Sequence, residues 1–187
     1  MVYMDETSVN LWGVLRKRTW TDNKSLHLPY QAKRGKNLTV YGSISGFMSE
    51  GVTDPHFRFI FSVVNKTNTV NTKAFLEKVI EEVPVPIAQI KLVCDNHSSH
   101  RSKATTQWAD SIGLNLFFMP AYSSAFNPVE RVWAALKIAV SKFMAKISVN
   151  YNHENFKGDV EAICKDLEGR LNPSILYSAD SDMDFSK

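Results

Sequence analysis

The sequence predicts an α/β domain whose sheet mixes antiparallel and parallel strands. Segments rich in β-branched and aromatic residues occupy the first third of the 187-residue chain, and helical and strand-like segments then alternate. The hydrophobic share is 44% and the charged share is 22%, as in folded soluble domains, which excludes a disordered, collagen-like or coiled-coil protein. The length suits one core with a small appendage.

Antiparallel strands are predicted in the first part of the chain. They are Val2 to Val9, Arg16 to Trp20, Leu38 to Phe47 and Phe57 to Val64. Asp5 is unusual in the first strand, because alternation places it on the same face as apolar Val9.

Helical and strand-like spacing alternates from residue 72 onward. Helices are predicted at Thr72 to Val83, Ser102 to Ile112, Pro128 to Lys146 and Glu154 to Leu171, and strands at Ile90 to Cys94 and Leu114 to Met119. Asn127 is expected to cap the third helix, with Pro128 in its first turn. The nearly continuous apolar run that ends at Cys94 predicts a buried parallel strand.

Charge is distributed unevenly, although the net charge is only +3. Seven bases and one acid lie between residues 16 and 36, a local charge of +6, whereas seven acids and three bases follow from Asp159 onward. The basic segment also contains Trp20 and Tyr30, so it is suited to hold a phosphate backbone and stack on bases. A solvated hairpin rim is the alternative interpretation. The candidate DNA-binding residues are Arg16, Lys17, Arg18, Lys33, Arg34 and Lys36.

Three acidic residues occupy informative places in this pattern. Asp5 lies in the first strand, Asp95 directly follows the buried strand, and Glu130 lies in the first turn of the long helix. Ligands of open α/β sheets bind beyond the carboxyl ends of strands, which is where Asp95 is expected. Converging carboxylates offer the oxygen ligands that Mg²⁺ prefers, and two such ions about 3.5–4 Å apart support in-line phosphoryl displacement.

The segments around these acids resemble a known family. VYMDETSVNLW, KLVCDNHSSHRS and FFMPAYSSAFNPVERVWAALK are similar to the three blocks of the DDE catalytic domain of the Tc1/mariner and IS630 transposase superfamily. The resemblance covers about residues 1 to 146, and thirty-four residues separate Asp95 from Glu130, the spacing typical of the Asp-Asp-Glu branch. It implies an RNase H-like, retroviral-integrase-like fold with a mixed five-stranded sheet flanked by helices.

The resemblance also implies an activity. Asp5, Asp95 and Glu130 would be the catalytic residues and the ligands of two Mg²⁺ ions, for which Mn²⁺ substitutes, and Asn96 and His97 would orient substrate or water beside them. Such enzymes are endonucleases that cut DNA at the end of an element. The freed 3′-hydroxyl then attacks target DNA, which gives DNA transposition, recombination and integration without a covalent protein intermediate.

Domain organisation and partners follow from the same resemblance. Residues 1–146 are expected to form the catalytic domain, and residues 147–187 an amphipathic helix with a polar acidic tail. The family's helix-turn-helix units do not precede the first block, so end recognition is expected from a separate chain or from an N-terminal part of the protein. The expected partners are double-stranded DNA, as transposon ends and target, and a second copy in a homodimer.

The expected location is inside the cell with the DNA, in the nucleus of a eukaryote or the cytoplasm of a bacterium. Cys94 and Cys164 form no CxxC pair, which favours a reducing compartment, and no apolar run is long enough to span a membrane.

Each acidic residue also has a simpler interpretation. Asp5 could be an ordinary acid at the edge of a strand, and Asp95 with Asn96 could begin a turn. Glu130 could complete a capping box by bonding back to Asn127.

Other residues admit alternatives too. His97 and His100 have an HxxH spacing that suits a transition metal, but no further His or Cys lies near in sequence, so a role beside the site is expected. Trp133 is expected to pack in the core, with DNA contact as the alternative, and Cys94 is expected to be buried rather than nucleophilic.

Two other functions compete with that of a transposase. One is a transposon-derived relic or domesticated DNA-associated protein without catalysis. The other is a nuclease of the same fold that acts on RNA in RNA–DNA hybrids.

Overall fold

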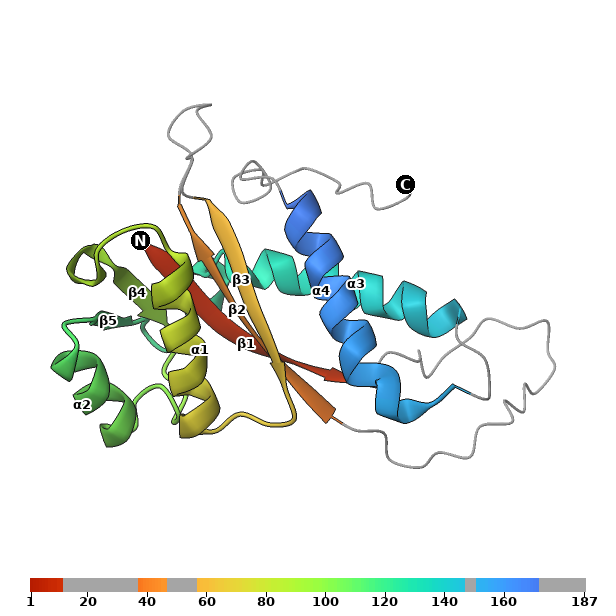
Figure 1. Ribbon diagram of the computed structural model, residues 1–187, viewed down its shortest axis with the longest axis horizontal. Coiled ribbons are helices and arrows are strands. Elements are labelled where there is room, and N and C mark those ends of the chain that lie inside the picture. Colours follow the sequence, from red (N-terminus) through yellow and green to blue (C-terminus); the bar gives the residue numbers. More distant parts are fainter. Residues whose placement is uncertain (12–36, 47–56, 147–150, 172–187) are drawn as a thin grey trace.

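The computed structural model describes residues 1–11, 37–46, 57–146 and 151–171. Its centre is a five-stranded sheet with the strand order β3-β2-β1-β4-β5 (Figure 1). The strands are β1 (Val2–Asn10), β2 (Asn37–Ser45), β3 (Arg58–Val64), β4 (Lys91–Cys94) and β5 (Asn115–Phe118). β1, β2 and β3 pair antiparallel, whereas β4 pairs parallel with β1 and with β5. This arrangement confirms the mixed sheet predicted from the sequence.

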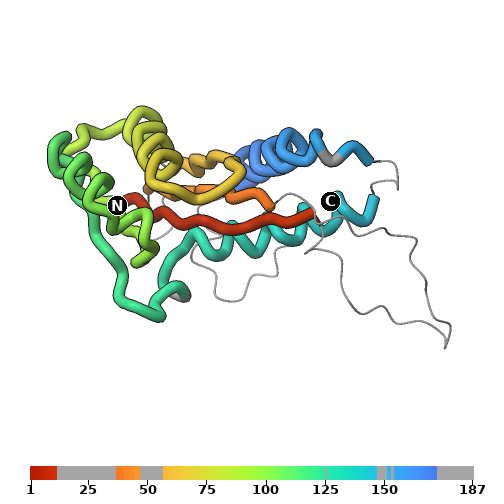
Figure 2. Tube along the Cα trace, turned by 90° about the horizontal axis from the view of Figure 1, so that it is seen from below, coloured from red at the N-terminus to blue at the C-terminus, as the bar shows by residue number. Residues whose placement is uncertain are grey.

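In the described part of the chain, four α-helices cover the two faces of the sheet. They are α1 (Thr69–Glu82), α2 (Lys103–Ser111), α3 (Val129–Lys146) and α4 (Phe156–Arg170). Buried residues of α1 and α2 share one apolar cluster with one face of the sheet, and those of α3 and α4 share the second cluster with the opposite face. Figure 2 shows α3 running alongside β1. The alternation of Val40 and Tyr41 between the two clusters shows why β2 is buried on both faces.

One close approach between α3 and the sheet depends on a glycine. Gly42 lies opposite Asp5 in the β1–β2 ladder. A Cβ atom at Gly42 would lie 2.4 Å from Cη2 of Trp133, so only glycine leaves room for the indole against the sheet. Trp133 is 1% exposed, which confirms the prediction that it packs in the core.

The predicted elements agree with the observed ones except at some ends. The helix predicted from Thr72 begins at Thr69, because the Asn68 side chain caps it by accepting a hydrogen bond from Asn71 N at 2.8 Å. Before α4, residues His153–Asn155 form a short 3-10 helix, so the helix predicted from Glu154 begins at Phe156. The strand predicted at residues 16–20 lies outside the described residues.

The C-terminal helix packs on the same core as the long helix. Phe156, Val160, Cys164 and Leu167 of α4 are buried in one cluster with α3 and the first three strands. The domain boundary at residue 146 stays a prediction. Both cysteines are free and buried, as expected for Cys94. No described helix combines the length and the apolar character needed to cross a membrane.

Candidate active site

Strand register brings the first two predicted carboxylates to the same level of the sheet. Tyr3 of β1 pairs with Val93 of β4 in the parallel ladder. Asp5 and Asp95 each follow their paired residue by two positions, so they lie on neighbouring chain segments at the point where β4 ends. The parallel pairing of β1 with β4 therefore brings two residues that are ninety positions apart in sequence onto neighbouring segments.

Asn127 joins the start of α3 to β1 and so carries Glu130 toward Asp5. Its buried side chain donates from Nδ2 to Met4 O at 3.1 Å and accepts from Val129 N at 3.2 Å. The capping role predicted for Asn127 is thus confirmed. The Asn127 N–H donates to Ser124 O at 2.8 Å, so the reciprocal capping box predicted as an alternative for Glu130 is not formed.

Asp5 is held in a buried, negatively charged environment. Trp133 Nε1 donates to Asp5 Oδ2 at 3.0 Å. Burial raises the pKa of Asp5 to about 6; the hydrogen bonds from Trp133 and the Glu6 backbone lower it, and the charges of Glu130 and Glu6 raise it. Burial is the largest of these effects, and the charge of Glu130 adds to it. The buried indole of Trp133 leaves no surface for the DNA contact considered as its alternative role.

Asp95 accepts two hydrogen bonds at one oxygen. Oδ1 accepts from His97 N at 2.9 Å and from His100 Nδ1 at 2.9 Å. The bond from His100 is the main cause that holds the pKa of Asp95 below its usual value. The first bond is an Asx-type turn, so the simpler interpretation of Asp95 is also correct. Both bonds use Oδ1 of a side chain that remains 44% exposed, so the turn and a ligand role are compatible.

Asn96 and His97, both predicted to orient substrate or water beside the site, make different contacts from each other. Asn96 donates from Nδ2 to Met119 O at 2.5 Å and so fastens the end of β4 to the end of β5. His97 is 43% exposed and contacts Glu6 and Ser99 through Nδ1. Asn96 therefore shapes the loops, and an orienting role for either residue stays a prediction.

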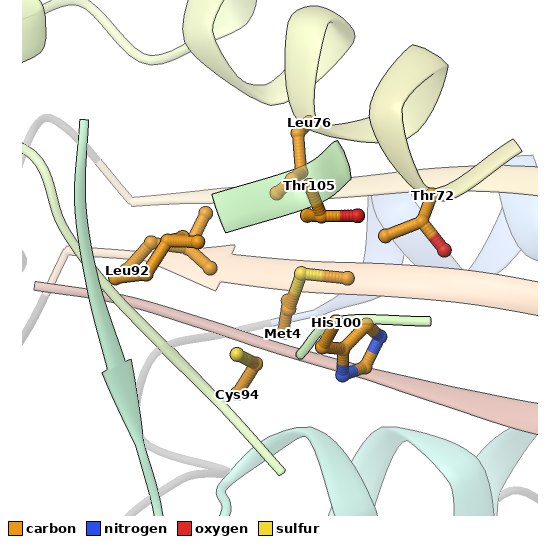
Figure 3. A pocket seen from close by; sticks show the side chains of 8 residues that line it. Met4, Thr72, Leu76, Leu92, Cys94, His100 and Thr105 are labelled. Atoms are coloured by element: carbon orange, nitrogen blue, oxygen red, sulfur yellow. The ribbon is translucent and has the colours of Figure 1, made fainter. Parts of the chain in front are cut away.

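Glu6 and the buried position of His100 were not predicted from the sequence. His100 Nε2 lies 3.0 Å from Glu6 Oε2, and the two side chains are 2% and 12% exposed. Figure 3 shows His100 in a pocket beside Met4 and Cys94, beneath Thr72 of α1. Burial lowers the pKa of His100, but hydrogen bonding, led by Asp95, outweighs this and raises it to about 12. The HxxH spacing was the only signal of this site, because Glu6 comes from β1.

The potential metal ligands fall into two groups of different chemistry. Within the described ranges, the group with ligand atoms all within 4.8 Å of one another is Glu6, His97 and His100, and not the three predicted carboxylates. The carboxylates nevertheless fit a hard cation. Their donors are all oxygen, and a cation would relieve the repulsion and burial that raise the pKa of Asp5.

An open hollow of about 340 Å³ adjoins Asp95, lined by residues 95–97 and 119–124. The loop between β5 and α3 forms one wall. In it Tyr122 has a positive φ of 63° and projects fully into solvent, and Phe126 is 81% exposed. The six predicted DNA-binding bases between residues 16 and 36 lie outside the described residues.

Comparison with known proteins gives one family. The sequence profile of the DDE superfamily endonucleases matches residues 1–150. No curated protein sequence matches the chain.

Solved structures share the fold at low sequence identity. The crystal structure of the Mos1 strand transfer complex is similar with a TM-score of 0.64 and 14% identity, covering 94% of this chain and 49% of that one. The catalytic domain of Mos1 mariner transposase has a TM-score of 0.58 and 12% identity, covering 94% and 72%. A simian T-cell lymphotropic virus intasome bound to PP2A regulatory subunit B56 gamma has a TM-score of 0.54 and 12% identity, covering 85% and 45%. The chain spans about half the length of the first of these structures.

Proposed function

Because this chain belongs to the DDE superfamily of endonucleases, we propose that it is the catalytic domain of a transposase, which cuts DNA strands and transfers them in a metal-dependent reaction. The observation that carries the proposal is the link between the strand that holds Asp5 and the helix that holds Glu130. These elements are β1 and α3, which the Asn127 bond to Met4 O links, and the charge of Glu130 contributes to the raised pKa of Asp5. Asp95 follows β4 at the level of Asp5.

Asp5, Asp95 and Glu130 would hold two Mg²⁺ ions, which Mn²⁺ can replace. When bound, such ions activate the attacking oxygen and stabilise the leaving oxygen of an in-line displacement at phosphorus. The chain's own residues prepare the ligands. Trp133 fixes one oxygen of Asp5, His100 keeps Asp95 ionised, and Asn127 docks the helix that carries Glu130.

The DNA would lie across the hollow beside Asp95. Tyr122 and Phe126 present exposed rings from the adjoining loop, and such rings stack on unpaired bases. The basic segment at residues 16–36 would neutralise phosphates. We further propose double-stranded DNA as substrate, a homodimer that joins two ends, end recognition by a further domain or chain, and a location with the DNA inside the cell.

The test is nicking of supercoiled plasmid by the purified chain in Mg²⁺ or Mn²⁺. Asp95→Asn is compared with Asp110→Asn, a control at an exposed position of α2. We expect metal-dependent nicking that Asp95→Asn abolishes and Asp110→Asn retains. Faster cleavage of an RNA–DNA hybrid than of duplex DNA would contradict the proposed substrate.

A second assay separates a defect in end recognition from a defect in catalysis. The same proteins are given a pre-nicked duplex with a free 3′-hydroxyl and a target plasmid. Joining that depends on Asp95 supports the proposal. Absence of both nicking and joining favours a domain without catalysis.

A further inference from the structure

Three side chains that can bind a metal come together from two distant parts of the chain beside the carboxylate site. His100 Nε2 lies 3.0 Å from Glu6 Oε2, and His97 Nδ1 lies 3.3 Å from Glu6 Oε1. All three residues have a ligand atom within 4.8 Å of those of the other two. Metal–ligand bonds of 2.0–2.1 Å place neighbouring ligands about 3.3 Å apart in a tetrahedron and about 2.9 Å apart in an octahedron. The 3.0 Å separation lies near the octahedral edge and the 3.3 Å separation near the tetrahedral edge, and they end on different oxygens of Glu6, so one ion would draw these side chains together by small shifts.

The same atoms lack well-directed hydrogen bonds. Both carboxylate oxygens of Glu6 and Nε2 of His100 are buried, and none has a hydrogen-bond partner of good geometry among the described residues. His100 is 2% exposed and aims Nε2 at the Glu6 carboxylate. A buried carboxylate is costly unless a positive group faces it, and either a bound metal ion or the protonated His100 ring would supply that charge here.

The opposite nitrogen of His100 is already oriented. Asp95 Oδ1 lies 2.9 Å from His100 Nδ1, which fixes the ring and presents Nε2 to Glu6. Histidines that bind metals usually donate their other N–H to a carboxylate in this way. Asp95 would therefore be the outer partner of this histidine while its own second oxygen remains for the catalytic site.

His97 provides the third ligand and the route from solvent. The side chain is 43% exposed, so water can reach the centre of the cluster and complete the coordination. Ser99 Oγ lies 2.8 Å from His97 Nδ1 and competes for this nitrogen. Binding of an ion would require the Ser99 hydroxyl to rotate away.

We propose that Glu6, His97 and His100 form a second metal site, which takes a divalent transition metal ion such as Zn²⁺ or Co²⁺. Two imidazole nitrogens and one carboxylate favour these ions over Mg²⁺, which prefers oxygen alone. The ion would join β1 to the segment after β4 and hold Asp95 in place through His100. This site does not depend on the proposed nuclease function, because its ligands differ from Asp5 and Glu130.

The test uses the chain with Asp5→Asn and Glu130→Gln, which removes the predicted catalytic ligands without touching the second site. Co²⁺ is titrated and followed by its visible absorption, and bound metal is counted after dialysis. We expect one Co²⁺ per chain, displaced by Zn²⁺ and not by millimolar Mg²⁺. Absence of a stoichiometric Co²⁺ spectrum overturns the proposal.

Further variants on this background assign the ligands. His97→Gln and Glu6→Gln should weaken Co²⁺ binding at least as much as the roughly 10–100-fold that loss of an outer partner costs. Ser99→Ala should retain or tighten binding, because it removes the hydroxyl that lies 2.8 Å from His97 Nδ1 and leaves only the longer 3.4 Å bond from the Ser99 N–H. Glu77→Gln, at an exposed position of α1, is the matched control and should leave binding unchanged.

His97 is half-exposed, so His97→Gln should fold normally, which circular dichroism and a thermal melt check. Unchanged Co²⁺ affinity in folded His97→Gln and Glu6→Gln would overturn the assignment. The cluster would then be a bridge in which protonated His100 links two carboxylates.

Discussion

Trp133 Nε1 donates a hydrogen bond to Asp5 Oδ2 at 3.0 Å, across 128 positions of sequence. The indole reaches the carboxylate because Gly42, opposite Asp5 in the neighbouring strand, has no side chain to block it. The largest buried side chain of α3 thereby orients a predicted catalytic carboxylate. Core packing and site geometry are thus coupled at Trp133.

Gly42→Ala should disturb this coupling. Its Cβ would lie 2.4 Å from Cη2 of Trp133, so the indole must shift, and overpacking of this kind lowers the free energy of unfolding by about 1–3 kcal/mol. Urea unfolding followed by tryptophan fluorescence measures the loss. Gly158→Ala is the control, because its Cβ meets nothing within 4 Å in α4, and alanine there should stabilise the helix by up to about 1 kcal/mol. Equal stabilities of the two variants would contradict the close approach.

Trp133→Phe should raise the pKa of Asp5 above its value of about 6, because the hydrogen bond from Trp133 lowers it. In an active enzyme, the acid limb of the pH–rate profile should move to higher pH. Carboxyl NMR of Asp5 measures the same change without activity. Trp108→Phe, in α2, is the matched control and should leave the Asp5 signal in place. An unchanged Asp5 titration in Trp133→Phe would show that the bond is not formed in solution.

Asp5 should also make stability depend on pH. Its folded pKa of about 6 lies above the ordinary value of 3.8, so the folded state binds the proton more tightly. The stabilisation is fully present below pH 3.8 and is lost as pH rises through about 6. Without divalent ions at pH 7, Asp5→Asn should therefore be more stable than the parent, by on the order of 2 kcal/mol.

Urea unfolding of both proteins at pH 4, 5.5 and 7 checks this dependence. Asp110→Asn should follow the parent at every pH. Divalent metal should reduce the advantage of Asp5→Asn at pH 7, because an ion stabilises the ionised carboxylate. We expect the parent to lose stability relative to Asp5→Asn as the pH rises from 4 to 7. A gain in its relative stability over this range would contradict the raised pKa of Asp5.

Glu130→Gln and Asn127→Ala should distinguish a residue needed for DNA cleavage from one needed to pack α3 against β1. Glu130 makes no capping-box bond, so Glu130→Gln should abolish cleavage while keeping the free energy of unfolding within about 0.5 kcal/mol. Asn127→Ala removes the buried bonds to Met4 O and Val129 N and should destabilise the fold by about 1–3 kcal/mol. Thermal melts and plasmid nicking measure both effects. Destabilisation of Glu130→Gln comparable to that of Asn127→Ala would assign Glu130 a structural role.

Neutralising the basic segment should weaken DNA binding. Replacement of Lys33, Arg34 and Lys36 by glutamine should make binding less dependent on salt. The negative slope of log K against log salt should become shallower by about 0.9 for each phosphate that the protein no longer neutralises. Fluorescence anisotropy of a labelled duplex at several salt concentrations measures the slope. The charge-matched control replaces Lys157, Lys165 and Arg170 of α4. The same slope in both triple variants would contradict a DNA-binding role for the basic segment and would support its interpretation as a solvated hairpin rim.

The local sequence pattern was sufficient to predict the order of the described helices and strands and the type of each. Alternation of apolar residues marks β1, and Asn127 with Pro128 marks the start of α3, because these signals lie within a few residues of the structure that they specify. The three motif blocks likewise indicated the family and the carboxylates Asp5, Asp95 and Glu130. Each of these inferences uses information that is contiguous in the sequence.

Only the tertiary structure decided which side chains meet. Glu6 and Asp5 are neighbours in sequence, yet Glu6 contacts His97 and His100 whereas Asp5 bonds to Trp133. These partners follow from the side-chain alternation of β1, its register with Gly42 and β4, and the docking of α3. These contacts join segments that are far apart in the chain, so the periodicity of a local segment cannot predict them.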